Sequence, residues 1–116
     1  MHFKLIIALV DDSETNRIMD AAREAGATGS TVITHARGEG LQTQRSFFGL
    51  ELESQRDMLL FLVEEHLSRS ILEKIDLTGD FENRKGSGIA FQIDVEDVVG
   101  ISHQIEKLTN VVEQEL

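Results

Sequence analysis

The hydrophobic residues of this chain gather in short stretches that predict four strands. His2–Val10 is almost continuously apolar from Leu5 onward, and Met58–Val63 has the same character. Apolar runs that do not alternate with polar residues are typical of strands covered on both faces. Thr31–Thr34 contains only β-branched residues, and Ile89–Val95 is a further segment of residue types that favour pleated sheets.

An acidic pair follows each of the two apolar strands, and a helical pattern comes after it. Asp11 can cap the first helix, and Glu14 three residues later suits a capping box. Glu64-Glu65 occupies the equivalent place before the second helix. Gly26 is expected to end the first helix, and Thr78-Gly79 the second. The predicted apolar faces consist of Ile18, Ala22 and Ala25, and of Leu67, Ile71, Leu72 and Ile75.

The strand–helix–strand pattern therefore occurs twice in tandem. Two such units predict an α+β, ferredoxin-like domain with both helices on one face of a four-stranded sheet. The other face is left bare, and a partner subunit is its simplest cover. We expect this domain to comprise residues 1–102, and residues 103–116 to form a short C-terminal helix with an apolar stripe that includes Ile105 and Leu108.

A long segment, Gly38–Gln55, separates the second and third strands. Connections of more than about 12–15 residues are uncommon in compact domains and are usually functional or disordered. Phe47, Phe48 and Leu50 make this one too apolar for a passive linker, so we expect them to contact a protein partner. The alternation of Phe48, Leu50 and Leu52 equally allows a β-ribbon that extends the neighbouring strands.

Two glycine-containing segments are candidates for binding an anion. Arg84-Lys85 followed by Gly86-Ser87-Gly88 could present two cations and backbone N–H groups, although ordinary turns use the same residues. Arg37-Gly38-Glu39-Gly40 stands where the second strand enters the long segment. Glycines at such a place permit sharp turns and the close approach of a ligand or another chain.

Composition excludes several classes of function. The chain has 116 residues and a formal net charge of −10, which makes nucleic acid a poor partner because Lys and Arg dominate phosphate binding. It has no cysteine, so disulfides and thiolate metal sites are excluded. There is no Gly-x-Ser-x-Gly turn and no Walker-type loop, so we predict no catalytic residues and no enzymatic activity.

The apolar stretches are also too short for a membrane protein. None approaches the roughly 20 residues of a membrane span, and the start of the chain lacks the pattern of a signal peptide. We therefore expect a cytoplasmic protein without membrane insertion.

The four histidines are scattered singly along the chain. His2, His35, His66 and His103 lack the i, i+4 spacing of a helical metal site, so we predict no metal site within one chain. A site assembled by symmetry between copies stays open, which would make the protein a trimeric metal-linked binding module; His35 and His103 are the residues to replace in testing it. A purely structural trimer is a further alternative.

Taken together, these motifs resemble the P-II nitrogen-regulatory signalling family over about residues 3–101. The resemblance is carried by the double βαβ pattern, Ala27–Val32, Gly38-Glu39-Gly40, Thr78-Gly79 and Ile89–Val95. It implies a homotrimer of ferredoxin-like subunits packed sheet to sheet, with adenine nucleotides (ATP, ADP or AMP) in the clefts between them. It also implies a long loop that reaches out to a regulated transporter or enzyme and changes shape with the ligand.

By position, the resemblance assigns a set of residues to the nucleotide. They are Thr28, Gly29 and Ser30 near the adenine, Gly38 and Gly40 near the phosphates, and Gly86, Ser87 and Gly88 in a second anion-binding loop, with Arg84 and Lys85 nearby. Arg37 is a further cation that, with these two, could substitute in part for cations of the family pattern.

Some cations of the family pattern are missing from this chain. The family's lysine before the last core strand corresponds to Ile89, and two arginines beyond that strand correspond to Gly100 and Ser102. The modifiable tyrosine of the long loop is also absent, since the chain has no tyrosine. A triphosphate with Mg²⁺ needs several donors or cations, so we expect binding of ATP to be weakened.

Overall fold

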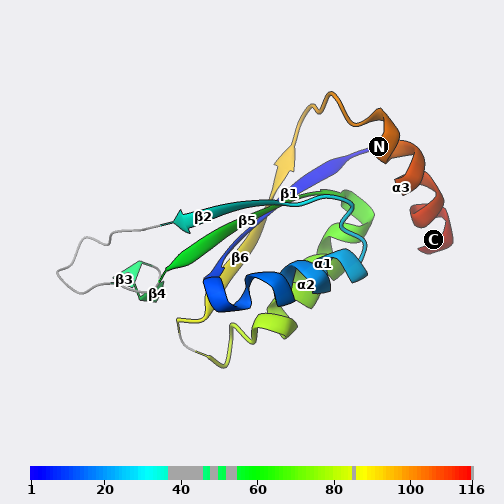
Figure 1. Ribbon diagram of the computed structural model, residues 1–116. Coiled ribbons are helices and arrows are strands. Elements are labelled where there is room, and N and C mark those ends of the chain that lie inside the picture. Colours follow the sequence, from blue (N-terminus) through cyan, green and yellow to red (C-terminus); the bar gives the residue numbers. More distant parts are fainter. Residues whose placement is uncertain (37–45, 48–49, 52–54, 85, 116) are drawn as a thin grey trace.

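Two strand–helix–strand units follow one another along the chain (Figure 1). The computed structural model describes residues 1–36, 46–47, 50–51, 55–84 and 86–115. The first unit consists of β1 (Phe3–Asp11), a 3-10 turn (Asp12–Glu14), α1 (Thr15–Glu24) and β2 (Thr31–Ala36). The second consists of β5 (Arg56–Glu64), α2 (Glu65–Gly79) and β6 (Gly88–Val95), and α3 (Ser102–Glu115) follows it. Between the units, β3 (Ser46–Phe47) and β4 (Leu50–Glu51) pair with each other.

The four long strands form one sheet in the order β2-β5-β1-β6, and all neighbours are antiparallel. Both α1 and α2 lie on the same face of this sheet (Figure 1). This arrangement confirms the predicted α+β, ferredoxin-like fold, including its C-terminal helix. The long predicted segment falls between β2 and β5, at one end of the sheet.

The hydrophobic core lies between the sheet and the two helices. Ile6, Ala8 and Val10 of β1 are fully buried there, together with Ile18 of α1 and Ile71 of α2. Alternate residues of a strand point to opposite faces, so the residues between them in β1 point away from the helices. Burial of each large aliphatic side chain contributes about 1.5–3 kcal/mol, and this layer is the main source of stability.

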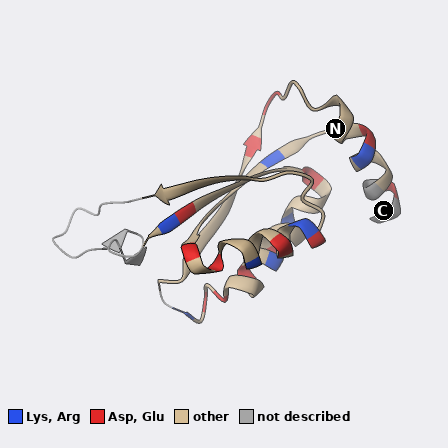
Figure 2. Cartoon of the chain, viewed as in Figure 1, with Lys and Arg blue, Asp and Glu red and all other residues tan. Residues whose placement is uncertain are grey.

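The opposite face of the sheet is also apolar, and no described segment of the chain covers its centre. Ile7 of β1 is paired with Leu60 of β5 on one side and with Phe91 of β6 on the other. Phe91 is 42% exposed and Ile93 is 48% exposed. In the four long strands, the Lys, Arg, Asp and Glu residues lie near the strand ends (Figure 2). We call this surface the open sheet face; it consists of Leu5, Ile7, Leu9, Ile33, Met58, Leu60, Leu62, Ile89, Phe91 and Ile93.

The open sheet face explains the continuous apolar runs of the sequence. The runs in β1 and β5 predict strands covered on both sides, whereas the described residues of one chain cover only the side that faces the helices. If the pattern reflects burial on both faces, a partner subunit is the simplest second cover.

Glu64 caps α2, as the sequence predicted, whereas Asp11 caps the 3-10 turn and α1 begins after Glu14 without a side-chain cap. The Asp11 carboxylate accepts hydrogen bonds from the Ser13 N–H and hydroxyl, at 3.0 and 2.8 Å. These bonds, and the charge of Arg56, hold the pKa of Asp11 below its usual value. Glu64 caps α2 in the same way, accepting from the His66 N–H at 2.8 Å.

The ends of the helices agree with the prediction at Gly26 and differ from it at Gly79. Gly26 has a φ of 120° just after α1, a value that glycine adopts without strain. In contrast, α2 includes Gly79, and the left-handed residue that follows is Asp80, with a φ of 53°. Gly79 is needed for a different reason, because a Cβ there would collide with the ring of Phe81.

The C-terminal helix α3 packs beyond one end of the sheet, near the N-terminus (Figure 1). Its Leu108 is 1% exposed and belongs to the core, and Ile105 packs against the same cluster. No helix in the described part of the chain is long and apolar enough to cross a membrane.

Candidate functional site

The residues predicted to contact an adenine lie in the connection from α1 to β2. Thr28, Gly29 and Ser30 border a pocket of about 250 Å³ on the helix side of the sheet. The structure therefore brings these three residues together at one hollow. The pocket is completed by Met19 and Arg23 of α1, Gly26, Ala27, Phe61 of β5 and Lys107 of α3.

The predicted anion-binding loop lies at the other end of the sheet. Gly88 opens β6 and is paired with Val10, near the end of β1, whereas Thr31 begins β2 and is paired with Leu60. Thr31 is level with Ile7, three residues from Val10, so at about 3.3 Å per residue it lies roughly 10 Å from Gly88 along the strands, and Thr28 precedes Thr31 on the side away from Gly88. One chain therefore does not bring the two predicted halves of the nucleotide site to one small ligand.

A buried arginine that sequence analysis did not single out anchors the glycine-rich loop. Arg56 is 7% exposed, and its guanidinium donates to the carbonyl oxygens of Gly86 at 2.8 Å and Ser87 at 3.4 Å. The Arg56 Nε–H and the Ser87 hydroxyl are buried without a partner among the described residues. Arg56 also faces Asp11 across the strand pair, in an arrangement that stabilises opposite charges.

The next residue, Asp57, is a second buried group that the sequence did not reveal. It is 7% exposed, and its carboxylate accepts a 2.6 Å hydrogen bond from the Thr15 hydroxyl at the start of α1. Arg56 and Asp57 precede the apolar run Met58–Val63, so the only signal was a charged pair at the start of a strand.

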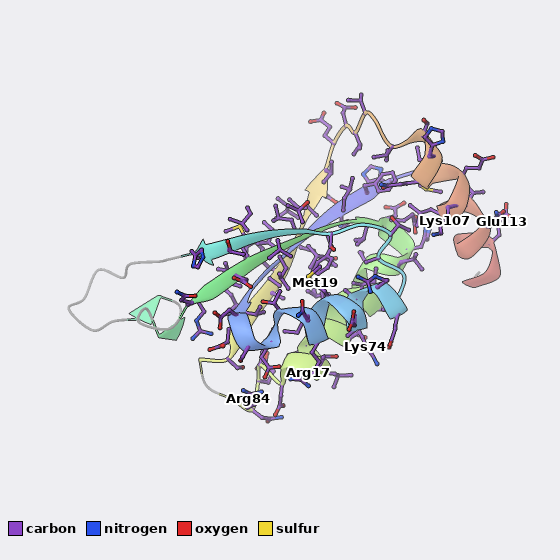
Figure 3. The ribbon with its side chains drawn as sticks, in the orientation of Figure 1. Arg17, Met19, Lys74, Arg84, Lys107 and Glu113 are labelled. Atoms are coloured by element: carbon purple, nitrogen blue, oxygen red, sulfur yellow. The ribbon has the colours of Figure 1, made fainter. Side chains whose placement is uncertain are left out.

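Arg84, a cation of the predicted anion-binding loop, already forms an ion pair within the chain. Arg84 binds the Glu14 carboxylate at 3.1 Å, and Arg17 binds it at 2.7 Å (Figure 3). The hydrogen bond from Arg17, which has the larger effect, and the one from Arg84 both lower the pKa of Glu14. The predicted capping box is therefore wrong, because Glu14 turns to these two arginines rather than to the helix end. Lys85 lies outside the described residues.

The long segment leaves and rejoins the sheet at neighbouring positions. Ala36, the last residue of β2, is paired with Arg56, the first residue of β5. The pairing of β2 shifts register between Ile33 and Ala36, and His35 within that shift has a φ of 61°. A left-handed conformation is uncommon for a residue other than glycine, so the entry to the segment is locally strained.

Several predicted residues of the long segment lie outside the described residues, namely Arg37, Gly38, Gly40 and Phe48. Phe47 and Leu50 lie in the paired strands β3 and β4. This pairing does not decide between a partner-binding loop and a β-ribbon, so both remain predictions.

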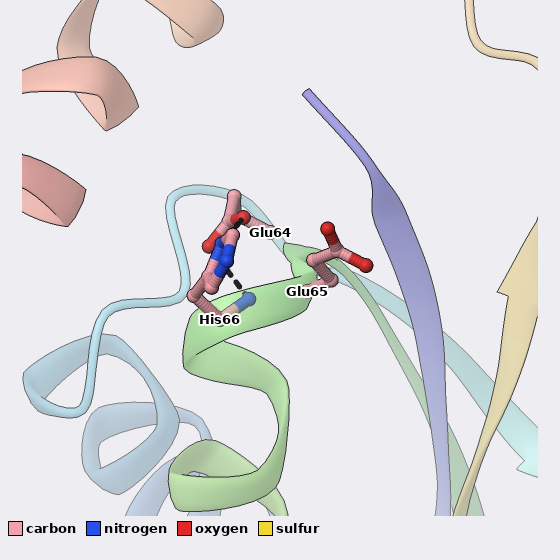
Figure 4. A group of neighbouring side chains, drawn as sticks. All are labelled: Glu64, Glu65 and His66. Atoms are coloured by element: carbon pink, nitrogen blue, oxygen red, sulfur yellow. Dashed lines mark hydrogen bonds and ion pairs between the residues drawn. The ribbon is translucent and has the colours of Figure 1, made fainter.

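Among the described residues, Glu64, Glu65 and His66 hold three possible metal-ligand atoms within 4.8 Å of one another. Both oxygens of Glu64 are already engaged, since Oε1 contacts His66 Nδ1 at 2.6 Å and Oε2 accepts from the His66 N–H (Figure 4). A helix cap accounts for these contacts. His35 and His103, the residues of the metal-linked alternative, lie in β2 and α3 and do not join this cluster.

The Glu64–His66 pair makes stability depend on pH. Its hydrogen bond and the charge of Glu64 raise the pKa of His66 above its ordinary value of 6.5. A raised pKa in the folded state stabilises the protein fully below pH 6.5 and loses that contribution as the pH rises through the raised value. Thermal unfolding followed from pH 6 to 9 should show a decrease that His66→Gln removes; an unchanged pH profile in that variant would contradict the assignment.

The fold and the residues described above define the class of protein. The chain is a ferredoxin-like domain with an uncovered apolar sheet face and a long excursion between its second and third core strands. Residues 3–104 match the family described as nitrogen regulatory protein P-II, and the chain belongs to that family. Proteins of this family are regulators rather than enzymes, so this is a P-II-like signalling protein.

Solved structures support the same fold. A PII-like signalling protein from Thermus thermophilus is 26% identical, with a TM-score of 0.61, and the alignment covers 84% of this chain and 91% of that one. CPII from Thiomonas intermedia, solved with ADP, AMP and acetate bound, is 20% identical, with a TM-score of 0.60 and coverage of 83% and 90%. No curated protein sequence matches the chain.

Proposed function

We propose that the protein is a homotrimeric regulator that controls a protein partner through Gly38–Gln55, in response to an adenine nucleotide bound between subunits. The observation that carries this proposal is the open sheet face, an apolar surface that residues 1–36, 55–84 and 86–115 leave uncovered at its centre. Members of the P-II family are typically trimeric and generally cytoplasmic, and we place this protein in the cytoplasm accordingly.

The separation of the predicted nucleotide residues supports a site between subunits. Thr28, Gly29 and Ser30 lie at one end of the sheet, and Gly86–Gly88 lie at the other. If subunits associate through their open sheet faces, the first group of one chain can approach the second group of its neighbour. The family resemblance assigns Gly38 and Gly40 to the phosphates, with Arg37 as a further cation; all three lie outside the described residues, and Ala36 before them is paired with Arg56.

The charges available at the phosphate end favour a nucleotide with few phosphates. Arg84 is shared with Glu14, and Ile89, Gly100 and Ser102 stand where the family carries cations. The presence of ADP and AMP in the Thiomonas relative agrees with this expectation. Arg56 contributes indirectly, because its guanidinium donates to the carbonyl oxygens of Gly86 and Ser87 and so restrains the glycine-rich loop.

Isothermal titration with AMP, ADP and MgATP tests the ligand. We expect AMP or ADP to bind more tightly than MgATP, because the missing cations penalise the highest charge most. The absence of a signal from all three nucleotides would remove the nucleotide from the proposed function.

Replacement of Phe47 and Phe48 by Ala tests the long segment. Apolar aromatic contacts commonly dominate binding to a protein partner, so the double variant should lose that binding while its association state stays unchanged. Partner capture that equals the unsubstituted chain would show that the contact lies elsewhere.

A further inference from the structure

Two arginines from different parts of the fold bind the carboxylate of Glu14. Arg17 of α1 donates to Oε2 from Nε at 2.9 Å and from a terminal nitrogen at 2.7 Å. Arg84, in the glycine-rich loop between α2 and β6, donates to the other oxygen, Oε1, at 3.1 Å (Figure 3). Glu14 therefore has one cation more than it needs to balance its charge.

The backbone of Arg84 is fixed within the loop, so its side chain is the part that can move. Its N–H donates to the Asp80 carbonyl at 2.9 Å, and its own carbonyl accepts from the Ser87 N–H at 3.0 Å. These bonds hold Arg84 beside Gly86–Gly88, the part of the loop that the family resemblance assigns to an anion. A long side chain anchored there can turn from Glu14 to an anion on the same loop.

Two further contacts keep the loop in this shape. The ring of Phe81 lies so close to Gly79 and Gly88 that a Cβ on either glycine would collide with it. The buried guanidinium of Arg56 binds carbonyl oxygens of the loop from the sheet side. A ligand therefore meets a preformed loop, and the Arg84 side chain is the group that adjusts.

The phosphate end depends strongly on this cation because backbone donors of the loop are already used. The N–H groups of Asn83, Arg84 and Ser87 all donate to carbonyl groups within the loop. Charged side chains form the stronger hydrogen bonds to phosphate oxygens. Among the described residues of the loop, Arg84 is the cation that can supply them.

Release of Arg84 from Glu14 costs little. The Arg84 side chain is 50% exposed, and water screens an ion pair of this kind. Glu14 is only 17% exposed, but it keeps both hydrogen bonds from Arg17 when Arg84 leaves. The carboxylate is therefore not left without a partner charge.

We propose that Glu14 competes with the nucleotide phosphates for Arg84, an inference that rests on the proposed function. In the empty site Arg84 is bonded to Glu14. In the occupied site it turns to a phosphate, and Glu14 retains Arg17. Glu14 thereby lowers the affinity of the site for nucleotide without touching the ligand.

Glu14→Gln tests the competition. The amide has the shape of the carboxylate without its charge, and Glu14 provides no side-chain cap to α1, so no helix cap is lost. Isothermal titration should show that the variant binds ADP about threefold more tightly than the unsubstituted chain, the factor expected when a half-exposed ion pair no longer has to be broken.

Glu73→Gln is the matched control, because it changes the net charge by the same amount on α2. Glu73 is 59% exposed and pairs with Arg69 on its own helix. This variant should bind ADP as the unsubstituted chain does. A Glu14→Gln chain that binds ADP no more tightly than Glu73→Gln would overturn the inference.

Arg84→Gln identifies the cation for which Glu14 competes. The single variant should bind ADP more weakly, and adding Glu14→Gln to it should give no gain, because the released cation is missing. A threefold gain in the absence of Arg84 would show that Glu14 acts through its charge alone, and the inference would then be wrong.

The same titrations separate this inference from the proposed function. If ADP binds the unsubstituted chain and Glu14→Gln equally well, the inference fails and the proposed function stands. If ADP binds neither chain, the nucleotide part of the proposed function fails and the inference falls with it. Binding of ADP by Glu14→Gln alone would support the inference, since the competition would then be strong enough to keep the unsubstituted site empty.

Discussion

A chain that carries Phe91→Glu is expected to fold normally but to remain monomeric. Phe91 is 42% exposed in the single chain and is paired with Ile7 at the centre of the open sheet face. If that face is buried between subunits, the substitution places a carboxylate in an apolar contact, which costs several kcal/mol without a partner charge. In the separate chain the same carboxylate stays in water. Sedimentation velocity at micromolar concentration, with circular dichroism as a check on folding, measures both effects.

Val99→Glu is the matched control for this prediction. Val99 is 94% exposed and lies outside the sheet, so a charge there should not affect association. A Phe91→Glu chain that sediments as the unsubstituted protein does would show that the open sheet face is not the interface. Dissociation by both variants would point to a general effect of added negative charge.

Replacing Arg56 with Met is expected to lower the free energy of unfolding by about 3 kcal/mol. Methionine fills a similar volume, but the carbonyl groups of Gly86 and Ser87 lose their charged donor, and Asp11 loses the charge beside it. Buried acceptors left without a partner account for most of this cost. Urea-induced unfolding followed by circular dichroism gives the difference.

Arg69→Met provides the comparison for the effect of a lost charge alone. Arg69 is 76% exposed and pairs with Glu73 one helical turn away, so its loss should change stability by less than about 0.5 kcal/mol. If Arg56→Met were as mild as Arg69→Met, the glycine-rich loop would not depend on the buried guanidinium.

The strands and helices of the core were predictable because their signals are local. The run Leu5–Val10, the β-branched Thr31–Thr34 and the capping residue Glu64 each act through neighbours in the sequence. The four-stranded sheet then followed from the repeat of one simple unit. The apolar pattern also indicated burial on both faces, and the described residues of one chain bury only the face toward the helices.

The site was harder to predict from the sequence than the strands and helices, because its contacts join residues that are far apart in the chain. No residue close to Arg56 in the sequence predicts that its guanidinium donates to the carbonyl groups of Gly86 and Ser87, about 30 residues later. Likewise, Glu14 could cap its own helix as far as the sequence shows, but Arg84 competes for it from across the fold. The pocket beside Thr28, Gly29 and Ser30 depends on how α3 packs, and the periodicity of Ile105 and Leu108 does not specify that placement.

The association state of the purified chain bears most directly on this account, because every site proposed between subunits requires that copies meet through their sheets. Sedimentation equilibrium at micromolar concentration should give a mass three times the 13.0 kDa of one chain. A mass of 13.0 kDa at that concentration would contradict the account, since Ile7, Phe91 and their apolar neighbours would then face water in the working protein.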